Sequence, residues 1–230
     1  MVGSVEEIAV RRLLSDSGWR QLPQACLEEL LGIGSVVQLA QDAPLEGRVA
    51  IVLYGVLGAF RGRDLSDAAV TELFFPFDLI ELEEVPNDGE DMLAALRPAQ
   101  VLQIPAAGFH TAMRRHAPLA HEVVARLKRQ AHDLREHVAE LTGKAPEHRL
   151  AAFLIWVSEM SGTEGERLSF ELPMRRYDMA RYLGMQPETL SRKIKGLVES
   201  GAISLRSPSR LVIEDRTALL SLAGTARRAA

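Results

Sequence analysis

The stretch LPMRRYDMARYLGMQPETLSRKIKGLVESGAISL, residues 172–205, decides the fold of the C-terminal part of the chain. Residues 177–182 predict a short amphipathic helix. Residues 183–185 predict a tight turn, in which Gly184 can adopt backbone angles that other residues avoid. Pro187 marks the start of a second helix, because the first helical position needs no N–H hydrogen-bond partner. Two short helices joined by a sharp turn predict a helix-turn-helix.

The second predicted helix, residues 187–200, has two different faces. The apolar face can pack against the first helix and consists of Leu190, Ile194, Leu197 and Val198. The other face carries Glu188, Ser191, Arg192 and Lys195. Arg can bind the O6/N7 edge of guanine, Glu can accept a hydrogen bond from N4 of cytosine, and Ser suits several base edges. We therefore interpret Glu188, Ser191 and Arg192 as base-reading residues, with an ordinary solvated helix face as the alternative.

A β-hairpin is predicted directly after the second helix. Gly201 ends the helix, and residues 202–205 and 210–214 form two strands around the turn at 207–209. A hairpin in this place is a wing, so the whole segment predicts a winged helix-turn-helix. The candidate contacts to DNA phosphates are Arg175, Arg176, Lys193, Lys195 and Arg210.

Four segments carry a resemblance to a known family. They are PETLSRKIKGLVESGAISL (187–205), LPMRRYDMARYLGM (172–185), EHRLAAFLIWVSEM (147–160) and ALLSLAGTARRAA (218–230). They resemble the CRP/FNR family of bacterial transcription regulators, and its FNR branch in particular. FNR-type recognition helices carry E-x-x-S-R, found here as Glu188, Ser191 and Arg192. CRP-type members carry R-E-x-x-G-R, from which this chain departs at Pro187 and Ser191.

The resemblance implies a homodimeric, cytoplasmic activator. Such a regulator would recognise an inverted repeat close to TTGAT and ATCAA, contact RNA polymerase, and act in low-oxygen or nitrogen-oxide metabolism. FNR itself senses oxygen through an iron–sulfur cluster held by four cysteines, whereas this chain has one, Cys26. A four-thiolate cluster within one chain is therefore excluded, and the nearest branches are FixK-like or denitrification-regulator-like. Cys26 lies in an apolar periodic stretch, which predicts a buried structural thiol.

Charge is distributed unevenly along the chain. The net charge is −4, but residues 173–230 hold 11 Lys and Arg against 5 Asp and Glu. Residues 1–172 hold 16 basic and 26 acidic residues. The basic part is the one with the reading helix, which favours a nucleic-acid partner. A head that binds a protein instead is the alternative, and DNA affinity would differ from it by falling steeply with salt.

The remaining composition bounds the class of protein. A chain of 230 residues with 25% charged residues fits two domains. No apolar run is long enough to span a bilayer, and Glu6 and Glu7 stand where a signal peptide would need basic and apolar residues, so we expect a cytoplasmic protein. No phosphate-binding glycine loop, nucleophile elbow or zinc-protease helix is present, which predicts that the protein is not an enzyme.

The N-terminal half predicts helices followed by strands. Residues 5–15 and 24–31 read as short helices separated by a turn at 16–18. Residues 35–109 are short apolar segments punctuated by Gly, Pro and Asn-Asp-Gly, which favours antiparallel β structure. The resemblance implies the double-stranded β-roll of cyclic-nucleotide-binding domains, giving an α+β fold. The predicted domains are the β-roll effector domain (1–112), a dimerisation helix (113–142) and the winged helix-turn-helix (143–230).

We do not expect cyclic AMP as a ligand. In nucleotide-binding members, a Gly-Glu-Leu helix and a later Arg next to Ser or Thr hold the cyclic phosphate. The corresponding stretches here are 77–80 and 86–91, without any Arg between Arg63 and Arg97. The acidic side chains in and around 87–91 would repel a phosphate.

A long helix from about residue 118 to 142 is predicted to form a dimer. Ala120, Val124, Leu127, Ala131, Leu134, Val138 and Leu141 recur at alternating spacings of four and three, a heptad seam. Packing of this seam on the chain's own β-roll is the alternative, and both can hold at once. Residues 143–146 break the helix and predict a hinge, followed by a helix over 148–160 with Trp156 in its core.

Six histidines lie between His110 and His148, the others being His116, His121, His132 and His137. None forms a His-x3-His pair with a nearby carboxylate, so solvated helix histidines are expected and no metal site is predicted. Haem ligation by one of them, as in nitric oxide or carbon monoxide sensors, is the alternative. A third possibility is a regulator that needs no effector.

Overall fold

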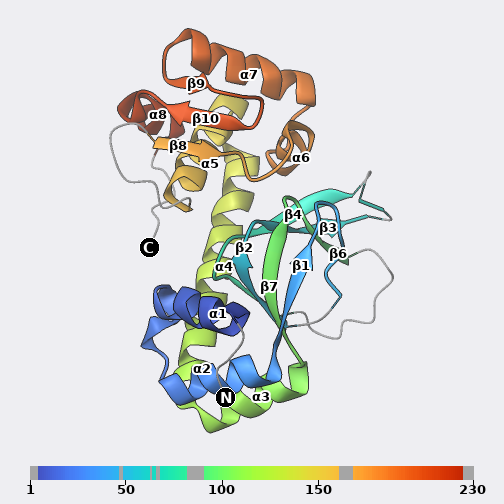
Figure 1. The fold of residues 1–230 in the computed structure, drawn as a ribbon. Coiled ribbons are helices and arrows are strands. Elements are labelled where there is room, and N and C mark those ends of the chain that lie inside the picture. Colours follow the sequence, from blue (N-terminus) through green and yellow to red (C-terminus); the bar gives the residue numbers. More distant parts are fainter. Residues whose placement is uncertain are drawn as a thin grey trace. The chain divides into compact units, whose positions relative to one another are not determined.

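The computed structural model describes residues 5–46, 49–62, 64–65, 68–81, 91–160 and 168–224. The chain divides into two compact units, Met1–Ala131 and His132–Ala230, and the boundary falls inside one long helix. Figure 1 shows the elements of both units. None of the helices in the described ranges is both long enough and apolar enough to cross a membrane.

The first unit begins with helices that cover a hydrophobic core. They are α1 (Val5–Ser15), the 3-10 helix η1 (Gly18–Gln21) and α2 (Gln24–Ile33), which confirms the two predicted helices. Ser17 caps η1 by accepting a hydrogen bond from the Trp19 backbone N–H at 3.2 Å. Trp19 is fully buried together with Leu14 and Leu30, so η1 is part of the core rather than a surface turn.

Two antiparallel sheets form the β-roll, as predicted. One has the order β1-β7-β2-β5 and the other the order β4-β3-β6. The strands are β1 (Ser35–Leu39), β2 (Val49–Tyr54), β3 (Leu57–Arg61), β4 (Ala69–Phe74), β5 (Leu79–Glu81), β6 (Asp91–Ala95) and β7 (Ala99–Ile104). Gly55, with φ +82°, separates β2 from β3, and a Cβ there would lie 2.4 Å from the Pro98 carbonyl oxygen. Most of the acidic stretch 87–91, which predicts that cyclic AMP does not bind, lies outside the described residues.

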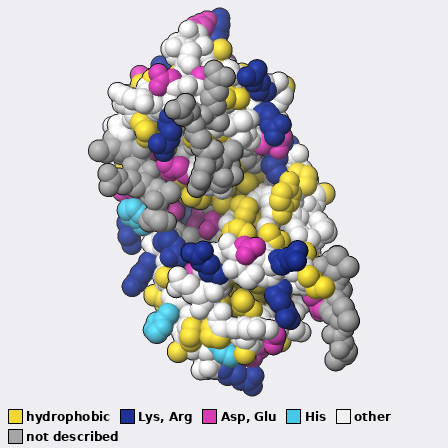
Figure 2. Space-filling view, turned by 60° about the vertical axis from the view of Figure 1, so that its left-hand side comes forward, with side chains coloured by type: hydrophobic (Ala, Val, Ile, Leu, Met, Phe, Trp, Pro, Cys, Tyr) yellow, Lys and Arg dark blue, Asp and Glu magenta, His cyan; other side chains and the backbone are white. Residues whose placement is uncertain are grey.

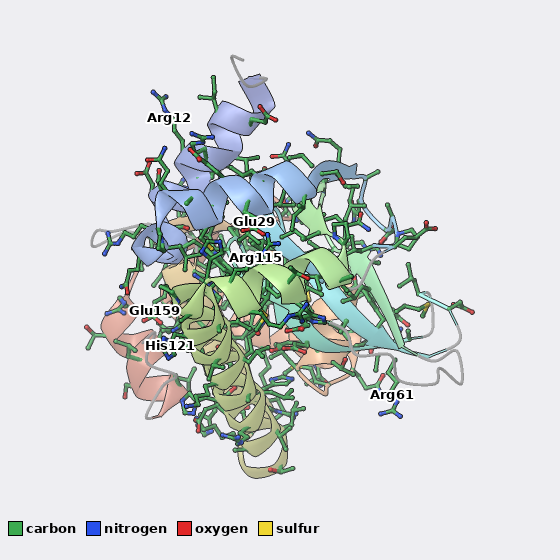
Figure 3. All side chains as sticks on the ribbon, turned by 90° about the horizontal axis from the view of Figure 1, so that it is seen from below. Arg12, Glu29, Arg61, Arg115, His121 and Glu159 are labelled. Carbon is green, nitrogen blue, oxygen red and sulfur yellow. The ribbon has the colours of Figure 1, made fainter. Side chains whose placement is uncertain are left out.

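A short helix that was not predicted from the sequence follows the β-roll. The segment 35–109 was predicted to form β structure, but its last residues belong to α3, which runs from Ala106 to Arg115 and buries Phe109 and Ala112. It is tied to α2 by Glu29, whose carboxylate pairs with Arg115 at 3.0 Å and with His116 at 2.8 Å. Figure 3 shows Glu29 and Arg115 on the two helices. The small residues of this helix hid its amphipathic pattern in the sequence.

The long predicted helix is present as α4 (Ala117–Gly143). In the first unit its buried face carries Leu119, Val123 and Arg126. Val124 and Leu127, which directly follow Val123 and Arg126 in sequence, are exposed. This part of the seam therefore does not pack on the β-roll. Leu134 and Val138 continue the exposed stripe, while Ala120, Ala131 and Leu141 are half-buried. Figure 2 shows that hydrophobic side chains also reach the surface among charged ones on one face of the molecule.

The second unit is a helical head with a small sheet. Its elements are α5 (Pro146–Met160), β8 (Leu168–Glu171), α6 (Arg176–Tyr182), α7 (Pro187–Glu199), β9 (Ile203–Leu205), β10 (Arg210–Ile213) and α8 (Arg216–Ala223). The strands are antiparallel in the order β8-β10-β9. Trp156 is buried, as predicted, in α5, whose residues from Leu150 to Ser158 are all buried. The helix break at 143–146 is confirmed, and Lys144 there donates a hydrogen bond to the Ala223 carbonyl oxygen at 3.1 Å.

Candidate nucleic-acid interface

The turn between α6 and α7 has the predicted geometry. Gly184 takes φ +60°, and the Met185 N–H donates to the Ala180 carbonyl oxygen at 2.9 Å. A Cβ on Gly184 would lie 3.0 Å from Leu141 Cδ2 and 2.9 Å from Arg149 Nη1, so both backbone conformation and space favour glycine. Pro187 opens α7, with Gln186 as its N-cap residue.

Helix α7 buries one face and exposes the other. Leu190, Ile194 and Leu197 are buried, which confirms three of the four residues predicted for the packed face. The fourth was wrong, because Val198 is 38% exposed. It lies one position beyond Leu197 and points away from the groove that the buried residues fill.

The predicted base-reading residues share the exposed face of α7. Glu188, Ser191 and Arg192 are all exposed. Positions three and four residues apart on a helix lie side by side, so a carboxylate, a hydroxyl and a guanidinium stand together in its first two turns. Arg192 Nη2 donates to Thr189 Oγ1 at 3.3 Å, a contact within the helix that engages one nitrogen of a guanidinium with five N–H donors. Thr189 was not singled out in the sequence, where it is one hydroxyl among many.

Three of the five predicted phosphate contacts are engaged in ion pairs. Their partners are Glu147 for Lys193 at 2.9 Å, Glu199 for Lys195 at 3.5 Å and Asp178 for Arg175 at 3.0 Å. Arg176 begins α6, and Arg210 is exposed at the start of β10 on the wing. The Lys195–Glu199 pair is exposed on both sides, and such a pair contributes about 0–1 kcal/mol, so a DNA phosphate can displace it. Arg175 is held more firmly, because its partner Asp178 is buried.

The Lys193–Glu147 pair predicts a gain in DNA binding when it is removed. The hydrogen bond to Lys193 is the main cause that lowers the pKa of the Glu147 carboxyl, so the pair stays charged at neutral pH. Glu147→Gln frees Lys193 to contact a DNA phosphate, and we expect severalfold tighter DNA binding. The slope of log binding constant against log salt concentration should become steeper by about 0.9 for each DNA-binding domain. Glu28→Gln, which breaks the Arg11–Glu28 pair in the other unit, is the control. Binding and salt slope equal to those of the unaltered chain would show that Lys193 meets no phosphate.

The wing is present as predicted. Strands β9 and β10 pair antiparallel, with Leu205 opposite Leu211. Ser207 Oγ accepts hydrogen bonds from the backbone N–H groups of Ser209 and Arg210, at 3.3 and 2.9 Å, and so holds the tip together. The third strand, β8, had no counterpart in the sequence reading.

One histidine contradicts the expectation of solvated side chains. His137 is only 5% exposed and stacks on the Tyr182 ring, with centroids 3.9 Å apart. His110 pairs with Glu81 at 2.9 Å, whereas His121 and His132 are exposed, as predicted. Within the described ranges, no three His, Cys, Asp or Glu residues gather as a metal site would require.

The buried thiol predicted for Cys26 is confirmed, and it yields a testable reactivity. Burial, with a smaller contribution from the Glu29 charge, raises the pKa of Cys26 to about 11. At pH 8 only about one thiol in a thousand would be ionised, and the thiolate is the reactive form. We expect no reaction with an aromatic disulfide reagent in the native protein at pH 8 and one thiol per chain in denaturant. Rapid native labelling at that pH would contradict this burial.

A helix-turn-helix with a wing and an exposed polar reading helix is the architecture of a DNA-binding head. Residues 148–222 match the family of the Crp-like helix-turn-helix domain. The chain is 39% identical over 89 residues to the nitrogen fixation regulation protein FixK of Azorhizobium caulinodans, covering 38% of this chain and 36% of that protein. It is 26% identical over 175 residues to the anaerobic regulatory protein of Pasteurella multocida, covering 75% of this chain and 64% of that protein. The matches therefore span less than two thirds of either relative.

The fold extends the likeness beyond the head. The structure of FixK2 from Bradyrhizobium japonicum superimposes with a TM-score of 0.72 at 22% identity, covering 86% of this chain and 100% of that one. The β-roll, the long helix and the winged head are thus those of known CRP/FNR structures. The comparisons thus show a Crp-like helix-turn-helix domain at residues 148–222 and the CRP/FNR fold for the chain.

Proposed function

We propose that the protein is a transcription regulator that binds DNA as a homodimer. The observation that carries the proposal is the exposed face of α7, where Glu188, Ser191 and Arg192 stand together over a buried apolar face. These side chains suit the edges of cytosine and guanine, and a helix of this kind fits the major groove. The target is an inverted repeat close to TTGAT and ATCAA.

The proposed homodimer is supported by the exposed apolar stripe of α4. Val124, Leu127, Leu134 and Val138 are all at least 41% exposed, although each is apolar. Apolar residues in a heptad pattern are buried by a second helix of the same kind, and the parallel pairing places two reading helices on one side. Two heads about 34 Å apart then match the two half-sites of a palindrome.

The names of two relatives support the proposed physiological role. Their names, an anaerobic regulatory protein and a nitrogen fixation regulator, support control of genes for low-oxygen or nitrogen-oxide metabolism. We further propose activation through contact with RNA polymerase in the cytoplasm. The effector is either absent or, as the alternative, a haem-bound gas.

The test combines binding with an absorption spectrum. Protein purified anaerobically from a haem-sufficient host is titrated against a TTGAT-type palindrome and a scrambled duplex over a range of salt concentrations. We expect a colourless protein that prefers the palindrome and loses affinity steeply as salt rises. A Soret band on which site binding depends would favour the haem sensor. Equal affinity for both duplexes, or insensitivity to salt, would refute base reading.

A further inference from the structure

The first unit buries an arginine on the inner face of α4. Arg126 is 7% exposed, and burial is the main cause that lowers the pKa of its guanidinium. A buried cation is costly unless fixed partners replace its water. Arg126 lies on the same helix as the apolar seam, so its partners show how that helix is held on the β-roll.

The partners of Arg126 come from three separate segments. Nη1 donates to the Phe77 carbonyl oxygen at 2.6 Å, and Trp19 Nε1 donates to that same oxygen at 3.0 Å. The guanidinium carbon lies 4.2 Å from the centroid of the Trp19 ring, in the range of a cation–π contact. Glu122, one turn earlier on α4, pairs with Nε at 2.8 Å. The N-terminal helices, the turn before β5 and α4 therefore meet at one side chain.

The backbone of Phe77 is itself constrained. It has φ +75°, a conformation that is costly for a residue with a large side chain. Its N–H donates to the Val52 carbonyl oxygen at 2.6 Å, so the turn is held on β2. The carbonyl group that accepts the hydrogen bond from Arg126 thus belongs to a turn that is anchored to β2.

The contacts of Arg126 fix the rotation of α4. Gln130, one turn later on the same face, donates from Nε2 to the Leu79 carbonyl oxygen at 2.8 Å. Val124 and Leu127 lie about 100° or more around the helix from Arg126, and both are exposed. A rotation of α4 on the β-roll would break these side-chain hydrogen bonds and redirect the seam.

We propose that Arg126 is a positioning residue that clamps α4 on the β-roll and thereby orients the dimer seam. This proposal goes beyond the proposed function. Its prediction that Arg126 affects dimerisation rests on the proposed homodimer. A lysine could reach the same carbonyl oxygen but would lose the planar stack on Trp19 and the fork of donors. A methionine would fill much of the volume without any donor.

Gly18 allows the clamp to be disturbed without changing Arg126. A Cβ on Gly18 would lie 2.6 Å from Arg126 Nη2, so Gly18→Ala must displace the guanidinium. Gly32 in α2 is the matched control, since a Cβ there meets nothing within 4 Å. Both substitutions add one methyl group to the N-terminal helices.

The experiment compares Gly18→Ala, Gly32→Ala, Arg126→Lys and Arg126→Met in the full chain. Dimer dissociation is measured by sedimentation without DNA, and the clamp itself by hydrogen exchange of the amides in residues 119–130. For Gly18→Ala and Arg126→Met we expect about tenfold weaker dimerisation and at least tenfold faster exchange, with Arg126→Lys between these and the parent chain. Gly32→Ala should match the parent chain.

The outcomes separate the two proposals. If the parent chain is monomeric, the proposed homodimer is refuted. The hydrogen-exchange rates of residues 119–130 still decide whether Arg126 clamps α4. Unchanged exchange and dimerisation in Gly18→Ala overturn the clamp. Because that variant keeps every polar group, the result stands even if Arg126→Met fails to fold.

Discussion

Arg192→Ala is expected to abolish the preference of the protein for its palindrome over a scrambled duplex. The exposed guanidinium stands on the first two turns of α7, beside Glu188 and Ser191. Loss of a bidentate guanine contact costs about 1–3 kcal/mol at each half-site, which is roughly 5- to 150-fold in affinity per half-site. Two half-sites per dimer multiply the effect. The measurement is competition between the specific and scrambled duplexes at fixed salt.

A control separates base reading from loss of positive charge. Arg12 on α1 is exposed, belongs to the other unit and extends into solvent in Figure 3. Arg12→Ala removes the same charge, and the preference for the palindrome should be unchanged. Thr189→Val adds a second test, because it removes the acceptor of the Arg192 contact while keeping the guanidinium. Arg192→Ala protein that still discriminates as well as the parent would refute the assignment of Arg192.

The sequence predicted those elements whose signal is local. The turn at Gly184, the start of α7 at Pro187 and the break at 143–146 all depend on residues with restricted or unusual backbone conformations, and they were confirmed. The period of the seam likewise located α4 to within a residue or two. Such signals act over a few residues, so tertiary contacts do not have to be known.

Features that depend on distant partners were missed. Arg126 resembles any other charged residue of an amphipathic helix until Trp19 and Phe77 are placed beside it. His137 was expected in solvent for the same reason, since only the fold brings Tyr182 against it. The ion pair that holds Lys193 also joins residues 46 positions apart in sequence. Periodicity identifies a face of a helix but not what that face meets.

Leu134→Asp is expected to convert the dimer to monomers. Leu134 is 42% exposed and lies in the middle of the apolar stripe of α4. In a parallel dimer it would face its own copy, so the variant would bring two carboxylates together in an apolar seam. An uncompensated buried charge costs about 3–5 kcal/mol, which corresponds to at least a hundredfold weaker association. Sedimentation velocity at several concentrations measures it.

The same variant tests whether pairing is needed for tight DNA binding. His132→Asp places the same carboxylate on α4 at an exposed position away from the stripe, so it should stay dimeric. Leu134→Asp monomers keep an intact reading helix and should bind a single half-site weakly, with the palindrome giving no added affinity. If Leu134→Asp were still dimeric at the concentrations where the parent is, the seam would lie elsewhere. In that case the exposed apolar residues of α4 would need another partner.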